Sequence, residues 1–114
     1  MRLKASIWVS AYVRRLGAIP VSAMITRRGD ADAGAIFIKI NRLDGSACVL
    51  RPALTMLEEP GERQWTHALK GETADESAAD AYLARQAEFD TDMWVIEVED
   101  REGRHFLDEF VKPE

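Results

Sequence analysis

One stretch of alternating residues constrains this fold more than any other part of the chain. The segment GAIFIKINRLDGSACVLRPAL, residues 34–54, carries Ile36, Ile38 and Ile40 at every second position. Successive side chains of a β-strand point to opposite faces of a sheet, so this spacing predicts a strand with one buried face. Asp44-Gly45 favours a turn, because glycine reaches positive φ without steric cost. The segment therefore predicts a central β-hairpin.

The length of the hairpin loop follows from the register that makes one face apolar. A two-residue turn would set Ile38 opposite the charged Arg51. A three-residue loop over residues 43–45 instead sets Ile38 opposite Leu50. Because a slip of one residue turns every side chain to the other face, we predict the three-residue loop, with Gly45 in the left-handed conformation.

The composition limits the class of protein. The 114 residues are 46% hydrophobic and 31% charged, which is typical of one folded domain, predicted over residues 1–114. A net charge of −5 argues against a general nucleic-acid binder, because such binding depends on Lys and Arg at phosphates. Cys48 is the single cysteine, so no intrachain disulfide can form, which suits a reducing compartment. No apolar stretch approaches the ~20 residues of a membrane span, and we predict a cytoplasmic protein without a membrane segment.

Periodicity predicts the remaining elements. Helical spacing predicts helices over residues 6–17 and about 75–89, the second opened by a capping box from Thr73 to Glu76. Alternation predicts further strands over residues 21–26, 64–69, 94–99 and 105–110. The last strand is expected to return beside the one before it, with Phe106 opposite Val98.

The resulting order is α-β-β-β-β-α-β-β, an α+β fold. Short connections between successive strands favour an antiparallel meander of five to six strands with the two helices packed on it. The alternating inward faces favour both helices on one side of the sheet, and helices on opposite sides are the alternative.

The most unusual local sequence is RRGDADAG, residues 27–34. Asp30 and Asp32 supply oxygen atoms that a hard cation could use. Arg27 and Arg28, together with exposed backbone N–H groups, could bind an anion instead. The favoured interpretation is a polar turn between strands, in which aspartate accepts hydrogen bonds from its own backbone.

An acidic run follows the second predicted helix. Its members are Asp90, Asp92, Glu97, Glu99, Asp100 and Glu102. If Asp92 came near the loop at residues 27–34, a divalent-cation site or a general acid/base pair could form. The simpler interpretation is a helix end followed by the solvated face of a strand. The candidate ligand-binding residues are therefore Arg27, Arg28, Asp30, Asp32 and Asp92, with no catalytic residue, metal site or cofactor predicted.

Three long strings resemble one protein family. They are RLKASIWVSAYVRR, RRGDADAGAIFIKINRLDG and AYLARQAEFDTDMWVIEVEDREGRHFL. Together they are similar to a family of short bacterial proteins known only as a domain of unknown function. The resemblance implies a small, stand-alone, cytoplasmic bacterial domain. It implies no activity, ligand or catalytic residue, because none is established for the family.

Two functions from different classes fit the sequence. The favoured one is a non-catalytic interaction module that binds a protein partner or self-associates, because many strands in a short chain leave sheet edges able to pair. The alternative is an enzyme that depends on a small ligand or a divalent cation. It would use the loop at residues 27–34 with carboxylates around residues 90–100, and it predicts a pocket where these segments meet.

Overall fold

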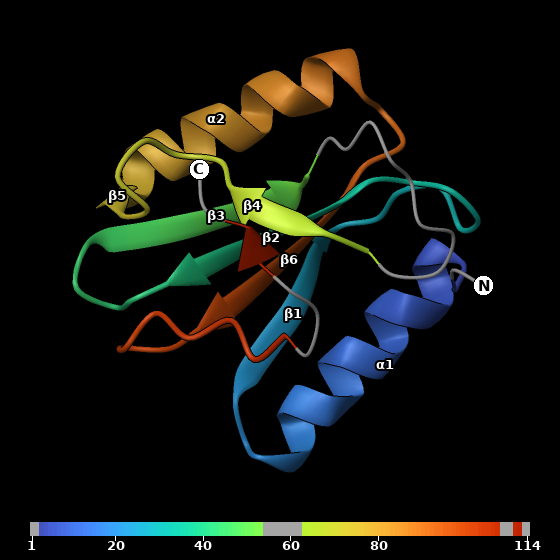
Figure 1. The fold of residues 1–114 in the computed structure, drawn as a ribbon, viewed down its shortest axis with the longest axis horizontal. Coiled ribbons are helices and arrows are strands. Elements are labelled where there is room, and N and C mark those ends of the chain that lie inside the picture. Colours follow the sequence, from blue (N-terminus) through green and yellow to red (C-terminus); the bar gives the residue numbers. More distant parts are fainter. Residues whose placement is uncertain (1–2, 54–62, 108–110, 113–114) are drawn as a thin grey trace.

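Two helices and a mixed sheet make up the part of the chain that the computed structural model describes, residues 3–53, 63–107 and 111–112. The helices are α1, Ala5–Ala18, and α2, Glu76–Phe89. The strands are β1 Ser22–Arg27, β2 Ile36–Asn41, β3 Ser46–Pro52, β4 Trp65–His67, β5 Ala74–Asp75, β6 Trp94–Glu99 and β7 Val111–Lys112. Figure 1 shows the sheet between α2 and α1.

The strand order of the sheet is β1-β6-β2-β3-β4-β7, with the short β5 paired to β3. β6 lies between β1 and β2, antiparallel to the first and parallel to the second. β7 is parallel to β4. The α+β class is confirmed, and the predicted antiparallel meander is wrong, because α2 carries the chain across the sheet and brings β6 back parallel to β2.

The central hairpin has the predicted register. Ile38 lies opposite Leu50, and the backbone N–H of Arg42 donates to the carbonyl of Ser46 at 3.0 Å. This bond closes a loop of three residues, and Gly45 has a φ of 91°. The three-residue loop is confirmed.

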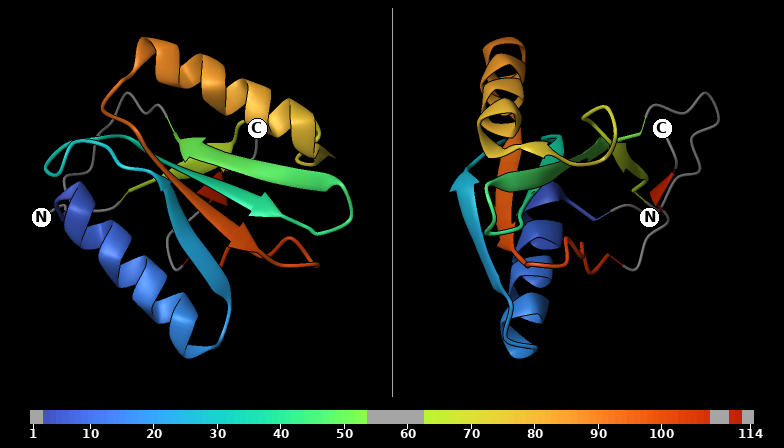
Figure 2. Two further views of the ribbon diagram at one scale, coloured as in Figure 1. Left: turned by 180° about the vertical axis from the view of Figure 1, so that it is seen from behind. Right: turned by 90° about the vertical axis from the view of Figure 1, so that its left-hand side faces the viewer.

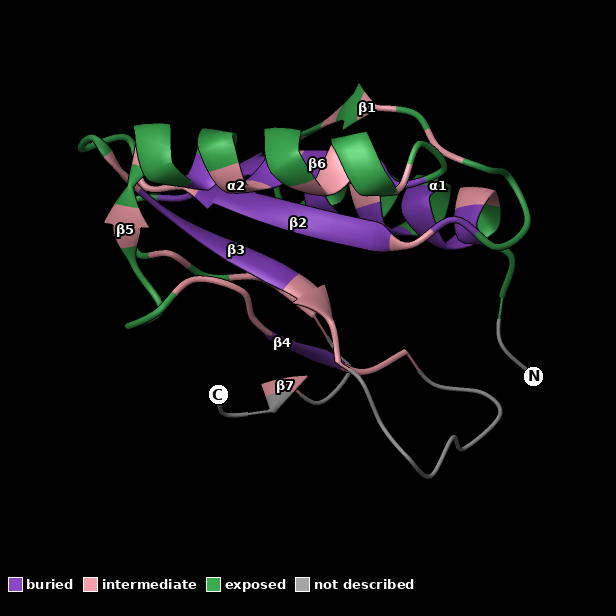
Figure 3. Cartoon of the chain, turned by 90° about the horizontal axis from the view of Figure 1, so that it is seen from above, coloured by how far each residue is buried: buried purple, intermediate pink, exposed green. Residues whose placement is uncertain are grey.

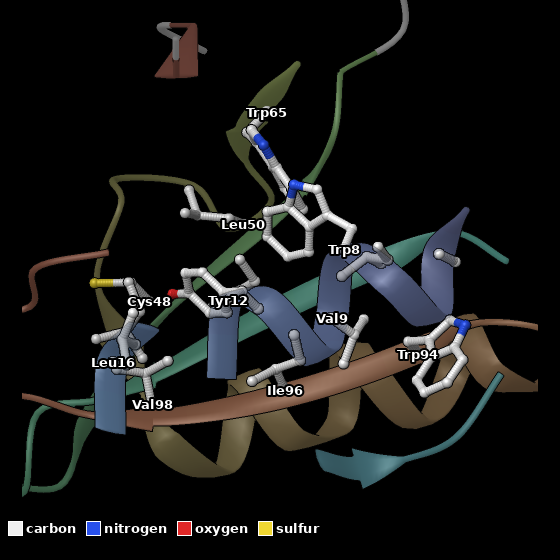
Figure 4. Packing of buried hydrophobic residues seen from close by; sticks show 14 residues of the cluster. Trp8, Val9, Tyr12, Leu16, Cys48, Leu50, Trp65, Trp94, Ile96 and Val98 are labelled. Carbon is white, nitrogen blue, oxygen red and sulfur yellow. The ribbon is translucent and has the colours of Figure 1, made fainter. Parts of the chain in front are cut away.

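The two helices lie on opposite faces of the sheet, so the alternative arrangement is the one observed. On one face, the isoleucines of β2 and neighbouring strands pack against α1 (Figure 4). This cluster includes Trp8, Val9, Tyr12, Leu16, Ile38, Trp94 and Ile96. The other face packs against α2 through Phe37, Ala47, Val49, Ala79, Leu83 and Val95. β2 is therefore buried on both faces, as expected for a strand with helices on either side.

The predicted last strand is wrong. Residues 105–107 form no strand, and residues 108–110 lie outside the described residues. The predicted pairing of Val98 with Phe106 is excluded because β1 and β2 already occupy both edges of β6. On the β2 side, Val98 lies opposite Ile40.

After β6 the chain turns back towards α1. The carboxylate of Asp100 accepts hydrogen bonds from the backbone N–H and the guanidinium of Arg104, each at 2.8 Å. The bond from Arg104 outweighs the effect of burial and lowers the pKa of Asp100. The hydroxyl of Tyr12 then donates to the carbonyl of His105 at 2.6 Å, which fastens this segment to α1.

The predicted capping box is absent at the start of α2. The N-cap residue is Asp75, and no side-chain hydrogen bond caps the helix. Because β5 pairs with β3, the residues before the helix are extended, and Thr73 lies too early to cap it. The carboxylate of Glu76 instead accepts a hydrogen bond from Lys39 at 2.8 Å. Neither helix in the described part of the chain is long and apolar enough to cross a membrane.

Candidate functional site

The loop at residues 27–34 packs against the start of β6. The backbone N–H of Asp30 donates to the carbonyl of Asp92 at 2.8 Å. The indole Nε1 of Trp94 donates to the carbonyl of Asp30, also at 2.8 Å. The two segments, whose approach the sequence raised only as a condition of the alternative function, do lie together, and main-chain groups make these contacts.

Two glycines allow this close approach. A Cβ atom on Gly29 would lie 2.1 Å from the carbonyl oxygen of Asp92, and one on Gly34 would lie 2.3 Å from the same atom. Both distances are far inside van der Waals contact, so only glycine fits at either position. The glycines of RRGDADAG are therefore explained by packing.

The carboxylate of Asp30 serves its own loop. Its Oδ2 accepts hydrogen bonds from the backbone N–H groups of Asp32, at 3.1 Å, and Ala33, at 2.9 Å. This is the geometry of the polar turn favoured from the sequence. Across the described ranges, no three His, Cys, Asp or Glu side chains gather closely enough to hold a metal ion.

The same loop caps the first helix. The carbonyls of Ala31 and Asp32 accept hydrogen bonds from the backbone N–H groups of Ser6, at 2.9 Å, and Ala5, at 3.2 Å. The first N–H groups of a helix have no partner inside the helix, so these carbonyls replace a side-chain cap. The carboxylate of Asp32 lies at the surface, 3.7 Å from the ammonium of Lys4.

The two arginines of the loop contact different groups. Nη2 of Arg27 donates to the carbonyl of Thr91 at 3.3 Å. The guanidinium of Arg28 lies over the ring of Trp94, 5.9 Å from its centroid. The five candidate residues thus share one region, and their contacts fasten the loop to the start of β6 and to α1.

Sequence reasoning missed Lys39, which lies at the centre of the sheet. Its side chain is only 4% exposed, and Nζ lies 2.7 Å from Asp80, 2.8 Å from Glu76 and 3.4 Å from Glu97. The carboxylates come from α2 and β6, so one ammonium group joins three elements. The amide of Asn41 adds a hydrogen bond of 3.1 Å to Glu76.

A shallow groove of about 280 Å³ lies between α2 and β1, beside this ion cluster. Its lining combines apolar and charged side chains, among them Arg27, Asp80, Leu83, Ala87, Val95 and Glu97. α2 packs over β2 and β3, and the groove lies at the side of α2 that faces β1. The face of the sheet next to β1 is therefore open on the α2 side.

The family model described as "Protein of unknown function (DUF1491)" matches residues 3–108. The chain belongs to the DUF1491 family. This confirms the resemblance seen in the sequence. The family's description names no activity, so any function of this DUF1491 domain must be inferred from its geometry.

Solved structures of similar proteins share the DUF1491 fold. A crystal structure of a DUF1491 family protein from Caulobacter crescentus CB15 is 40% identical, covers 98% of this chain and 99% of that chain, and gives a TM-score of 0.81. An NMR structure of a DUF1491 family protein from the same organism is 41% identical, covers 98% of both chains and gives 0.81. A solution structure of a protein from A. tumefaciens is 32% identical, covers 100% and 99%, and gives 0.80. Among curated proteins, none matches the chain.

The charge cluster of this DUF1491 domain suits anchoring. Burial alone would lower the pKa of Lys39, but hydrogen bonds to Asp80 and Glu76 and the charge of Glu97 raise it well above its ordinary value. Lys39 therefore stays protonated at neutral pH and has no lone pair for attack on a substrate or for accepting a proton. The cluster holds α2 on the sheet.

Proposed function

We propose that the chain is a non-catalytic interaction module that binds an extended polypeptide segment along the outer edge of β1. One observation carries this proposal: among the residues that the structure describes, β1 ends the sheet and has β6 as its one neighbouring strand. The right-hand view of Figure 2 shows β1, in light blue, at one rim of the sheet. The outward N–H and C=O groups of such a strand can form a ladder with another chain.

Side-chain exposure on β1 supports the same surface. Along β1, exposed residues alternate with half-buried ones, and Figure 3 shows the strand in green and pink at the rim. Met24, in the middle of the strand, is 51% exposed. A paired segment would cover this flexible apolar side chain, and methionine adapts readily to different partners. At the opposite end of the sheet, two residues of β7 lie within the described part of the chain.

A photo-crosslinking residue placed at position 24 tests this proposal. We expect Met24→p-benzoylphenylalanine, expressed in the native host, to crosslink to a single segment of a single protein, which mass spectrometry would identify. The matched control is Leu43→p-benzoylphenylalanine, because Leu43 is 44% exposed and lies in the hairpin loop away from β1. The control is expected to give no specific product.

The pattern of crosslinks separates a docking edge from a merely exposed side chain. An edge that pairs with a defined strand holds position 24 against the same neighbour each time. Crosslinks scattered over many abundant proteins, or equal products from positions 24 and 43, would contradict the proposal.

A further inference from the structure

We infer that the segment that pairs with β1 is β1 of a second copy of this chain, an inference that rests on the proposed function. The two strands would run antiparallel about a two-fold axis perpendicular to the sheet. The two sheets would then form one continuous sheet across the dimer. Such an interface is closed, because each copy uses its single open β1 edge.

The side chains of β1 match themselves in one register. A two-fold axis perpendicular to the sheet leaves each side chain on its own face, so a residue on the α2 face must oppose another on that face. Met24 lies on the α2 face, opposite Glu97 of β6, whereas Ala23 and Ile25 pack towards the α1 core. With Met24 opposite Met24 of the second copy, Ala23 lies opposite Ile25. Both faces of the junction then combine apolar side chains, with small against large on the α1 face.

The ends of the paired stretch also fit. In the same register Ser22 lies opposite Thr26 of the second copy, and paired hydroxyl side chains are favourable across antiparallel strands. The register between β1 and β6 shifts between Ile25 and Arg27, so a bulge ends the regular strand at this point. The paired stretch is therefore short, and the dimer is expected to be weak.

Charges at the two ends of β1 are complementary. In this register, Arg27 of one copy lies near Ser22, the first residue of β1, in the other copy. Within each chain, Ser22 lies opposite Glu99 of β6. The two-fold axis repeats this approach of Arg27 to Glu99. Within the chain, Nη2 of Arg27 donates to the carbonyl of Thr91 at 3.3 Å, and this bond lies at the surface. The guanidinium carries further N–H groups that can donate to a carboxylate of the second copy.

Sedimentation velocity over a range of concentrations tests the second copy directly. We expect a dimer with a dissociation constant on the order of 10 µM, because interfaces of this small size are weak. Met24→Lys places two ammonium groups opposite each other on the axis and is expected to weaken the dimer at least about 10-fold. Leu43→Lys makes the same chemical change away from β1 and is expected to dimerise like the unmodified chain.

A charge exchange tests the register. Arg27→Glu alone is expected to weaken the dimer, and Arg27→Glu combined with Glu99→Arg is expected to restore it, because the approach of opposite charges is re-formed. Thermal unfolding of each variant at a concentration where all are monomers checks that the fold is intact. A dimer that Met24→Lys leaves unchanged would overturn the inference, as would a charge exchange that restores nothing.

The outcomes separate this inference from the proposed function. Even a weak interface should be occupied at about 500 µM. If the chain is still a monomer at that concentration, the inference that a second copy pairs with β1 is wrong. If position 24 still crosslinks to one segment of another protein, the interaction module stands and its partner is a different chain. If the monomer gives no specific crosslink either, both proposals fall.

Discussion

Lys39→Met is expected to lower the free energy of unfolding by about 3 kcal/mol, near the low end of the range for removing one partner of a buried ion pair. The change removes hydrogen bonds to Asp80 and Glu76 and leaves Glu97 beside them without the balancing ammonium. Asp80 and Glu76 are 59% and 37% exposed and recover water, which limits the loss. Urea unfolding followed by circular dichroism measures the change.

A matched control separates burial from charge. Lys4→Met removes an ion pair of 3.7 Å to Asp32 whose side chains are 65% and 72% exposed, and it is expected to have almost no effect. The pKa of Lys39 is raised on folding, so its contribution is fully present below the unfolded pKa of about 10.4 and is lost only as pH rises further. The difference between the unmodified chain and Lys39→Met should therefore hold up to about pH 10 and shrink above it. If Lys39→Met left the free energy of unfolding unchanged, the anchoring role of Lys39 would be contradicted.

Gly29→Ala is expected to cost about 3 kcal/mol, the upper end for overpacking a site. The added Cβ would lie 2.1 Å from the carbonyl oxygen of Asp92 and 2.6 Å from the carbonyl carbon of Met93. Both are backbone atoms at the start of the β6 segment, so they cannot move aside as a flexible side chain can. Thermal unfolding and urea unfolding both report the loss.

The same substitution elsewhere should act in the opposite direction. Gly17 lies in α1 and has no atom within 4 Å of an added Cβ. Gly17→Ala is expected to stabilise the chain by about 0.5 kcal/mol, because alanine favours the helical backbone over glycine. Equal effects of the two substitutions would show that the loop at residues 27–34 is not packed as described.

Local features of this fold could be predicted from the sequence, and non-local ones could not. The hairpin register follows from the alternation of side chains within residues 34–54, so the predicted pairing of Ile38 with Leu50 is confirmed. In the sheet, β6 lies between β1 and β2. The alternation of side chains along Trp94–Glu99 shows that the segment is a strand, but it does not show which strands lie beside it. The prediction of a strand over residues 105–110 is wrong for the same reason. That strand was expected to pair with β6, but β1 and β2 occupy both edges of β6.

The capping box failed for a related reason. The spacing from Thr73 to Glu76 satisfies the motif, but the pairing of β5 with β3 sets the helix start at Glu76. The glutamate then binds Lys39, a residue 37 positions earlier in the chain. A short motif cannot report such a competing long-range partner.

The sequence contained one signal for the buried charge cluster. Lys39 is flanked on its own face by Phe37 and lies opposite Val49, so apolar residues surround it on that side. If this face of β2 is taken as buried too, the pattern predicts a helix on each side of the sheet. It also predicts carboxylates near Lys39, because a buried ammonium needs oppositely charged partners. The identity of those carboxylates, Asp80 among them, depends on how α2 crosses the sheet and is not encoded locally.

The candidate site divides in the same way. The sequence correctly favoured a self-capped turn at Asp30, and it raised the approach of residues 27–34 to Asp92 only as a condition of the alternative function. It could not show that β1 ends the sheet, because an edge is defined by the order of all the strands. The surface proposed for binding therefore emerged only from the assembled topology.

Residue-resolved amide hydrogen exchange on dilute protein, at about 1 µM, tests the open edge of β1 most directly. Every second amide of an edge strand points away from the sheet. Between Ser22 and Thr26, we expect these outward amides to exchange at least about 100-fold faster than the amides of Ile38 and Ile40 in β2, which has strands on both sides. If all the β1 amides exchanged as slowly as those of β2 in the dilute chain, the edge would already be covered, and a docking role for β1 would be contradicted.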